Sequence, residues 1–358
     1  MNGKDISIIR MHNQRLATSS CAGAQELAGH MGALQAQSYR MVKWALGLRL
    51  GGTTKEDIEQ AIADGKIIRT HLLRPTWHFV AAKDLRWMLK LTAPRIKVAA
   101  RSRQKQLGLS EELISRSKVV VGDALAKEKY LSRKELVVKL EEAGFENKDN
   151  LASHLLLHAE LDGIICNGPS KNNNYTYALL DERIPGFEKF TKDEALAELV
   201  RRYFQSHGPA TLEDFTWWSG LTKTSARKAL EMIGPDFTSA EIGSQEYWFD
   251  EKQSLGNDSE QAYLLPAYDE FIISYRNRDM IIPEGENRKK AISNNGIFRP
   301  VILHNGQVIG LWKRSVKKEA VYVELDFFER PSKKIRSRVE TAAEKFAFFL
   351  GKKLNLIQ

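Results

Sequence analysis

Residues 131–180 read LSRKELVVKLEEAGFENKDNLASHLLLHAELDGIICNGPSKNNNYTYALL, and this stretch indicates how the whole chain is organised. Ser132 is followed three residues later by Glu135, a capping-box pattern that predicts the start of a helix. Leucines at helical spacing predict a second helix over 151–162. Residues 163–180 then predict a strand, a polar loop and a second strand. Two helices followed by a hairpin are typical of a helix-turn-helix with a wing.

The same pattern, helices followed by a hairpin, occurs three times along the chain. The last copy combines helical apolar spacing with Gly and Pro breaks, and it predicts helices over 195–204, 211–219 and 222–233 and a hairpin over 237–249. The first copy is looser, with helices expected over 6–19, 23–34 and 54–63 and strands over 66–73 and 76–80. A basic stretch over 83–118, expected to be helical, joins the first copy to the second.

The sequence changes in character after Ser259, where short β-type runs replace the helical pattern. These runs cover residues 263–266, 271–275, 298–303, 308–312 and 320–328. Asn305 and Gly306 form a dipeptide that strongly favours a tight hairpin turn. Residues 333–351 predict a final helix with basic residues near both ends. The C-terminal part is therefore expected to be a small β-rich unit closed by a basic helix.

Positive charge is concentrated in two regions of the chain. The 358 residues include 54 Lys and Arg against 45 Asp and Glu, a formal charge of +9. Between residues 288 and 353, 16 basic residues face 6 acidic ones, so the remainder carries 38 against 39. A second basic stretch without acids contains Arg95, Lys97, Arg101, Arg103 and Lys105. Clustered positive charge favours a polyanion, because each neutralised phosphate releases counterions; a solvated helix face is the alternative for each region.

Several classes of protein are excluded by what the sequence lacks. Cys21 and Cys166 alone support neither a disulfide scaffold nor a thiolate zinc site, and they fit a reducing cytosol. The start of the chain lacks the pattern of a signal peptide, and no apolar run is long enough to cross a bilayer. Phosphate-loop, dinucleotide-binding and nucleophile-elbow motifs are missing. His154 and His158 lie one helical turn apart without the Glu of a zincin, so we expect no metal and no cofactor.

A series of short motifs, in a fixed order, covers nearly the whole chain. They lie at Gln14–Leu16, Leu34–Gln37, Arg69–Thr70, Leu73–Val80, Gly208–Thr211, Trp217–Leu221, Leu264–Glu270 and Asn295–Pro300. With these motifs the chain resembles the AlkZ-like winged-helix DNA glycosylases, bacterial enzymes that remove alkylated bases and unhook interstrand crosslinks. The resemblance implies an α+β, mainly α fold with three tandem winged-helix units, a small C-terminal β-barrel-like unit and a terminal helix. We expect the units at 1–115, 116–190, 191–258 and 259–358.

The resemblance also implies where the chemistry takes place. The catalytic signature of the family, Gln-apolar-Gln, falls on Gln35, Ala36 and Gln37. A related branch ends this motif in Asp, so Gln37 places the chain nearer the crosslink-unhooking branch. Two positions depart from the family pattern and bear on substrate range. Pro75 replaces the Gly of an Arg-Gly-Thr-x-His segment, and Ala36 is smaller than the usual middle residue.

Glutamine suits a cationic lesion, although an amide is a poor base. A purine alkylated at N7 or N3 is positively charged and leaves as a neutral base, so it needs little acid assistance. Two amide carbonyls can then position a water and stabilise the positive sugar. The expected substrate is double-stranded DNA with alkylated or crosslinked purines, bound by a monomer in the bacterial cytosol. The expected DNA contacts are Arg74, Thr76 and His78 on the first hairpin, with Arg95, Arg101, Arg103 and Arg299.

Alternatives stay open from the sequence alone. Arg74, Thr76 and His78 can instead belong to a salt-bridged wing. Trp77 can either stack on a base or lie in the core. We also expect Trp217 and Trp218 to lie in the core. Asp269 and Glu270 are interpreted as ion-pair partners of Arg276 and Arg278. An acid on a DNA-facing surface would repel phosphate, so a catalytic role would require one of them to lie close to the sugar. A winged-helix regulator without catalysis would show the same repeats and charge. A scaffold for protein partners would explain the repeats but not the concentrated charge.

Overall fold

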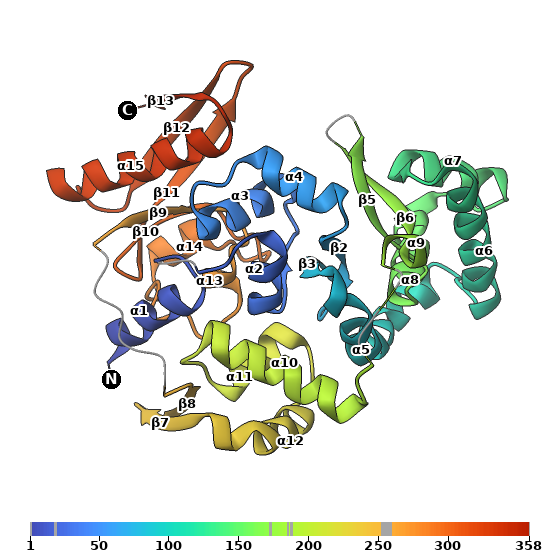
Figure 1. The fold of residues 1–358 in the computed structure, drawn as a ribbon, viewed down its shortest axis with the longest axis horizontal. Coiled ribbons are helices and arrows are strands. Elements are labelled where there is room, and N and C mark those ends of the chain that lie inside the picture. Colours follow the sequence, from blue (N-terminus) through green and yellow to red (C-terminus); the bar gives the residue numbers. More distant parts are fainter. Residues whose placement is uncertain are drawn as a thin grey trace.

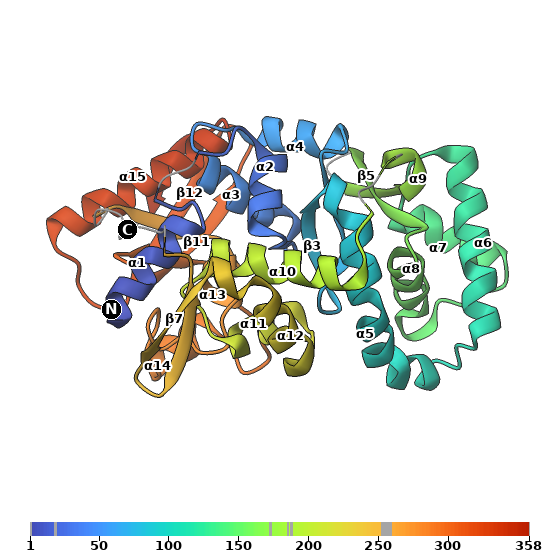
Figure 2. The same ribbon diagram turned by 60° about the horizontal axis from the view of Figure 1, so that its bottom comes forward.

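The fold is that of a computed structural model describing residues 2–17, 20–171, 174–184, 186, 189–251 and 260–357 (Figure 1). It is α+β, as expected from the sequence. Figures 1 and 2 show the C-terminal sheet with α15 (Lys333–Phe349) at one end of the molecule and α6 (Glu111–Glu128) with α7 (Arg133–Glu142) at the other. Short 3-10 helices cover Ala82–Asp84, Lys148–Asn150 and Gly234–Asp236.

The N-terminal region combines five helices with one three-stranded sheet. Its elements are α1 (Gly3–Asn13), α2 (Ala24–Met31), β1 (Leu34–Gln35), α3 (Tyr39–Leu50), α4 (Lys55–Ala63), β2 (Ile67–Leu72), β3 (Thr76–Ala81) and α5 (Leu85–Gln106). The antiparallel strands are ordered β1-β3-β2. The expected helices over 6–19 and 23–34 end earlier in the structure, and Leu34 and Gln35 lie in a strand, because β3 pairs with them.

The region quoted at the outset forms the elements expected of it. The strand β4 (Leu131–Ser132) lies between α6 and α7 in the chain. After α7 come α8 (Leu151–Leu161), β5 (Ile165–Lys171), β6 (Asn174–Leu179) and α9 (Leu180–Arg183), and the strands are ordered β4-β6-β5. The capping box is confirmed: the Glu135 backbone N–H donates to Ser132 Oγ, and the Glu135 carboxylate accepts from the Ser132 N–H. The expected polar loop includes residues 172 and 173, which lie outside the described residues.

The third region also follows the sequence closely. It contains α10 (Lys192–His207), α11 (Leu212–Ser219), α12 (Lys223–Ile233) and the antiparallel pair β7 (Thr238–Ile242) and β8 (Gln245–Phe249). Gly220 ends α11 in the left-handed conformation (φ 70°), which glycine adopts without strain. The expected boundary between residues 258 and 259 falls on residues outside the described ones.

The C-terminal region is an open five-stranded sheet packed against α15. Its elements are β9 (Ala262–Leu265), α13 (Glu270–Ile273), α14 (Glu286–Ala291), β10 (Val301–His304), β11 (Gln307–Val316), β12 (Ala320–Phe327), α15 and β13 (Lys353–Ile357). The strands are ordered β13-β12-β11-β10-β9. Asn305 and Gly306 form the expected turn, both with positive φ.

One expected strand in this region is wrong. Residues 271–275 were expected to be β-type, but residues 270–273 form the short helix α13. The Asp269 side chain caps this helix by accepting from the Phe271 N–H, and Phe271, Ile272 and Ile273 are all buried. A short, fully buried apolar run has no periodicity that separates strand from helix, so tertiary packing decides.

Two cores hold the N-terminal, third and C-terminal regions together, while the second region has a core of its own. One cluster joins α1, α10, α11 and the C-terminal sheet, and another joins α2, α3 and α4 to α15 and the other face of that sheet. Gly47 allows α3 to pack closely against α15, because a Cβ there would lie 2.5 Å from the Phe349 ring. Among the described helices, none is long and apolar enough to cross a membrane.

Candidate active site

The backbone of the Gln35–Gln37 segment is fixed by three hydrogen bonds from different parts of the chain. The Gln35 N–H donates to Glu270 Oε1, at the start of α13. The Ala36 N–H donates to the Trp77 carbonyl at 2.7 Å, and the Ala36 carbonyl accepts from Arg69 Nε at 3.1 Å. Ala36 itself is completely buried. The segment is therefore a rigid edge of the β1-β3-β2 sheet, whose conformation depends on the C-terminal region as well as on its own hairpin.

The two glutamines of the motif have different surroundings. Gln35 is buried (6% exposed), and its Oε1 accepts a hydrogen bond from Arg74 Nη2 at 3.0 Å. Because a guanidinium only donates, this contact identifies the carbonyl oxygen and orients the amide nitrogen away from Arg74. Gln37 is exposed and lies immediately before the N-cap of α3, Ser38. The motif thus presents one clamped and one exposed amide.

The turn between β2 and β3 brings Arg74 to Gln35. Leu73 has a positive φ of 59°, which is unusual for a branched side chain, and the Thr76 N–H donates to the Arg74 carbonyl at 2.6 Å. Pro75 is exposed at the tip. The proline that replaces the family's glycine is therefore compatible with a tight turn that keeps Arg74 on Gln35. Among the described residues, Arg74 Nε and Thr76 Oγ1 are buried without a hydrogen-bond partner.

His78 lies beneath this turn and is completely buried. Its Nδ1 lies 3.0 Å from the Thr76 carbonyl, and burial lowers the pKa of His78 to about 4, so the ring is neutral at pH 7 with its proton on Nδ1. Nε2 is buried without a hydrogen-bond partner within the part of the chain that the structure describes. The structure therefore places the expected DNA-contact residue His78 behind the hairpin surface, because its ring packs inward.

Glu270 is a functional candidate that the sequence assigned to an ion-pair network instead. It is 2% exposed, accepts from the Gln35 N–H and from Trp218 Nε1 at 3.2 Å, and is also hydrogen bonded by Ser274 Oγ. Burial alone would raise the pKa of Glu270, but the nearby His207 ring and the hydrogen bond from Ser274 Oγ outweigh it and lower the pKa to about 2. A buried, ionised carboxylate thus lies directly behind Gln35.

The ion pairs expected around Asp269 and Glu270 are wrong in their partners. Asp269 forms a two-pronged ion pair with Arg49 (2.7 and 2.8 Å), and both side chains are fully buried. Arg276 instead approaches Glu213 at 3.6 Å, and Arg278 donates to the Ile272 carbonyl. Arg49 could not be predicted as the partner, because it lies 220 positions from Asp269 in the chain and only the packing of α3 brings the two side chains together.

An aromatic cluster supports the motif from the side of the second region. The Arg69 guanidinium is buried over the rings of Trp77 (3.9 Å to the centroid), Tyr175 (4.8 Å) and Tyr39 (5.3 Å). Tyr39 Oη lies 2.8 Å from Ser170 Oγ on β5. The hairpin β5–β6 is therefore packed against the segment that follows Gln37, and Trp77 is a partly buried stacking partner of Arg69.

Trp217 and Trp218 were both expected in the core, and this is wrong for Trp217. Trp218 is completely buried, whereas Trp217 is 39% exposed. Arg74 and Arg278 lie over the Trp217 ring at 5.5 and 5.3 Å from its centroid. On α11 the two side chains point in different directions, and the sequence offers no signal for which one faces solvent. An exposed aromatic ring therefore lies next to the arginine that clamps Gln35.

The remaining expected DNA-contact residues are exposed but do not lie on the Gln35 hairpin. Arg95, Arg101 and Arg103 lie on α5, where Arg95 donates to the Gly220 carbonyl and Arg103 to the Asp149 carbonyl. Arg299 is exposed just before β10. Solvent can therefore reach all four arginines, although Arg95 and Arg103 also form hydrogen bonds within the protein.

A basic cavity of about 620 Å³ adjoins the start of α3 and was not found from the sequence. Five cationic residues and two acidic ones line it: Arg40, Lys43, Lys55, Arg314 and Lys352, with Glu56 and Glu59. Lys43 and Lys55 share Glu59 (2.6 and 3.1 Å). Burial, and then the like charge of Arg40, lowers the pKa of Arg314. The cavity therefore carries unneutralised positive charge three residues along the chain from Gln37.

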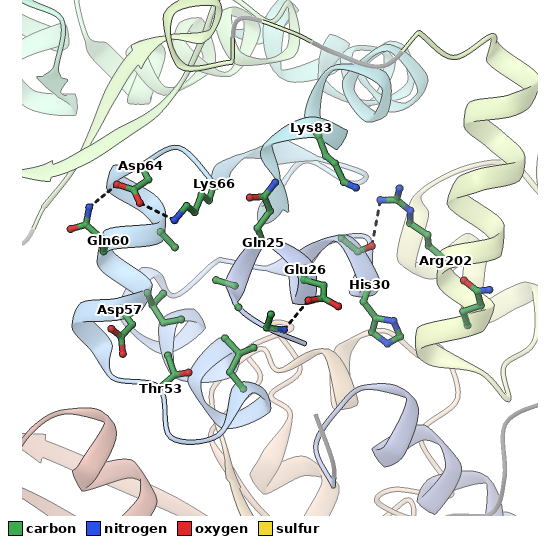
Figure 3. A pocket seen from close by; sticks show the side chains of 18 of the residues that line it. Gln25, Glu26, His30, Thr53, Asp57, Gln60, Asp64, Lys66, Lys83 and Arg202 are labelled. Carbon is green, nitrogen blue, oxygen red and sulfur yellow. Dashed lines mark hydrogen bonds and ion pairs between the residues drawn. The ribbon is translucent and has the colours of Figure 1, made fainter. Parts of the chain in front are cut away.

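A larger cavity, with a volume of about 980 Å³, lies elsewhere, between α2, α4 and α10 (Figure 3). Neither Gln35 nor Gln37 lines it. Its charged side chains are largely paired, as Lys66 is with Asp64 (3.1 Å) and Arg202 with Glu198 (2.7 Å). Size alone would select this cavity, but the paired charges and the absence of the glutamines from its lining lead us to place the active site at the Gln35 hairpin.

Comparisons with known proteins identify the family of the chain. A family model described as "DNA glycosylase AlkZ-like" matches residues 28–349. The interstrand DNA cross-link repair glycosylase of Streptomyces sahachiroi is 24% identical over 318 residues, 85% of each chain. The solved structure of the Streptomyces sahachiroi DNA glycosylase AlkZ covers all of both chains with a TM-score of 0.81 at 21% identity, so the fold is shared. A family of enzymes favours the glycosylase interpretation over a regulator or a scaffold. The chain belongs to the AlkZ-like DNA glycosylase family.

Proposed function

We propose that this DNA glycosylase hydrolyses the N-glycosidic bond of N7- or N3-alkylated purines in double-stranded DNA, including purines joined in an interstrand crosslink. The observation that carries the proposal is the pairing of a clamped, buried Gln35 with an exposed Gln37 on one rigid strand edge. The name of the Streptomyces sahachiroi relative supports crosslinks as substrates. An exposed Gln37 is reachable by a lesion that stays in the duplex.

The two glutamines have separate roles in this proposal. Gln35 Oε1 already accepts from Arg74, so its amide N–H groups and one remaining lone pair face the substrate side. Gln37 is exposed, and its carbonyl oxygen can accept a hydrogen bond from the attacking water. Gln35 is thus the orienting group and Gln37 the acceptor for water, because a clamped amide holds its direction while an exposed one adjusts to the lesion.

The reaction balances without an acid or a metal at these residues. The C1′–N bond breaks and its electron pair passes to the cationic purine, which leaves neutral. The positive charge then lies on the deoxyribose, where water adds at C1′ and releases one proton to solvent. Amide oxygens stabilise this charge electrostatically. Because no proton need be supplied to the leaving base, glutamine suffices for a lesion that is cationic from the start.

The architecture that we propose around this site has three tandem winged-helix units followed by a curled C-terminal sheet. The units cover residues 1–115, 116–190 and 191–258, and the sheet covers residues 259–358. Each of the sheets β1-β3-β2, β4-β6-β5 and β7-β8 follows helices of its own region, which supports the assignment. The separate core of the second region supports its status as a unit. We further propose that the enzyme acts as a monomer; the mass of the DNA complex by light scattering tests this.

The proposed DNA contacts form two groups around the motif. Near the motif lie Arg74, Thr76 and the exposed Trp217, with the basic cavity at Arg40 and Arg314. Farther away are Arg95, Arg101, Arg103 and Arg299. Because His78 is buried, we propose for it a supporting role beneath the hairpin rather than a phosphate contact.

The test measures release of 7-methylguanine from duplex DNA with enzyme in excess. We expect Gln35→Ala and Gln37→Ala each to lower the single-turnover rate by about 10²-fold or more, the size typical of a lost electrostatic group. Gln35→Glu should also be inactive, because the carboxylate pairs with Arg74 and removes the amide donors. Undiminished release by both alanine variants, with folded protein, would contradict the proposal.

A further inference from the structure

We propose that Glu270 is the fixed negative charge of this active site, a positioning residue that acts through Gln35 to stabilise the positive charge on the deoxyribose. This inference rests on the proposed function and adds to it a residue outside the Gln-Ala-Gln motif. The contact that motivates it is direct: Glu270 Oε1 accepts the backbone N–H of Gln35, while both residues are buried.

The charge of Glu270 is not neutralised by an arginine, unlike that of three other buried carboxylates. Asp269 pairs with Arg49, Asp214 with Arg10 (3.7 Å) and Asp84 with Arg202 (2.6 Å). Among the described residues, the one basic group within ion-pair distance of Glu270 is His207, whose Nε2 lies at 3.6 Å. Burial lowers the pKa of His207, which favours the neutral ring. Glu270 therefore keeps a net negative charge inside the protein.

The position of this charge favours the transition state over the bound lesion. During cleavage the positive charge moves from the purine to the sugar, so a fixed anion accelerates the step only where it lies nearer the sugar. Glu270 lies behind the backbone of Gln35, the residue proposed to orient the sugar and its water. In a buried, water-excluded setting such a charge acts with little screening.

Arg74 completes the arrangement on the other side of Gln35. Its guanidinium holds the Gln35 side chain at 3.0 Å, while Glu270 holds the backbone of the same residue. The charges of Arg74 and Glu270 influence each other, which favours the charged form of Arg74 despite its burial. Gln35 is thus held between opposite charges, and loss of Glu270 leaves the positive one without its counterpart.

The test is Glu270→Gln, which removes the charge and keeps the shape. Its carbonyl can still accept the Gln35 N–H, and its amide can donate to Ser274 Oγ, so only the Trp218 Nε1–H loses its acceptor. We expect the single-turnover rate on 7-methylguanine to fall about tenfold or more, with duplex affinity and melting temperature close to wild type. Glu270→Asp keeps the charge and should recover part of the rate if it folds.

The matched control is Glu160→Gln. Glu160 is also a fully buried carboxylate that accepts a backbone N–H, that of His71 (3.2 Å), and faces a histidine side chain. The Glu160→Gln variant should keep the single-turnover rate of base release within about threefold of wild type. A Glu270→Gln enzyme with the wild-type rate, or one that changes only affinity or melting temperature, overturns the inference. Active Gln35→Ala would instead overturn the proposed function, so the two failures are distinguishable.

Discussion

At the scale of single residues, His78 couples the hairpin to pH. Burial lowers the pKa of His78 to about 4 from an ordinary value of 6.5, so the unfolded chain binds a proton before the folded one does. The contribution of His78 to the free energy of unfolding is therefore fully present above pH 6.5 and is lost as the pH falls toward 4. The shift corresponds to about 3 kcal/mol in the free energy of unfolding. We expect the urea midpoint to fall steeply between pH 7 and pH 4.5.

The comparison for this expectation is His78→Asn, whose amide can donate to the Thr76 carbonyl in place of Nδ1–H. This variant should show a shallower decline over the same pH range. His30, whose pKa burial also lowers to about 4, remains in both proteins and supplies a common background. Identical pH dependence of the two midpoints would show that His78 is not buried as the neutral ring.

Single residues also mark the limit of prediction from sequence. Gln35 and Arg74 were found from motifs, and the structure brings them together at 3.0 Å. Glu270 is assigned from the sequence to an ion-pair network, because its hydrogen bond to Gln35 joins residues 235 positions apart and only the fold brings them together. Trp217 and Trp218 are chemically identical neighbours, and only the packing of α11 exposes one of them. Long-range contacts of this kind leave no trace in local spacing.

At the scale of elements, two capping boxes of the same design differ in burial. Asp57 caps α4 at the surface, whereas Asp214 caps α11 in the interior, where it also accepts the Arg276 N–H at 2.8 Å and faces Arg10. We expect Asp57→Ala to lower the free energy of unfolding only slightly, because this cap lies at the surface. Asp214→Ala should cost about 3–5 kcal/mol, because it leaves the buried Arg10 charge unpaired.

Both variants are measured by urea unfolding of the full chain, and the caps serve as controls for each other because they occupy the same helix position. Equal costs would mean that the interior box contributes no more than a surface one. The result separates the local effect of a cap, which the sequence pattern identifies, from the effect of burial, which it does not.

The elements that were predicted correctly are those with local signals. The capping box at Ser132 and the Asn305–Gly306 turn are set by neighbouring residues, and both are present. The helix α3 was missed, since Gly47 in its middle weakens the helical signal. That glycine is explained only by the Phe349 ring of α15, which occupies the space a side chain would need. Tertiary packing thus decided the elements that sequence reasoning missed.

At the scale of the whole molecule, the basic cavity lies where the N-terminal helices meet the C-terminal sheet. Arg40 comes from α3 and Arg314 from β11, and Figures 1 and 2 show the β11–β12 hairpin and the β5–β6 hairpin on either side of α4. We expect Arg40→Ala/Arg314→Ala to weaken duplex binding. The slope of log K against log salt should fall by about 1–2, since each lost phosphate contact contributes about 0.9.

An equal loss of charge on α12, Lys223→Ala/Arg227→Ala, is the control for position, because both side chains are exposed and α12 lies across the molecule from α4 (Figure 1). Fluorescence anisotropy with undamaged duplex at several salt concentrations gives the slopes. The same change in both double variants would indicate that net charge matters and the cavity does not. The saturated rate of base release should be preserved in the cavity variant.

The hydrogen bond between Gln35 and Glu270 has a consequence for the order of events during synthesis. The ribosome produces the glutamine motif early and the residue that holds its backbone only after three quarters of the chain. A nascent or prematurely terminated chain that ends before Glu270 carries the reactive motif without its support. Such fragments should therefore be inert toward the genome, and full hydrolytic competence is reached only when the last quarter of the polypeptide has docked.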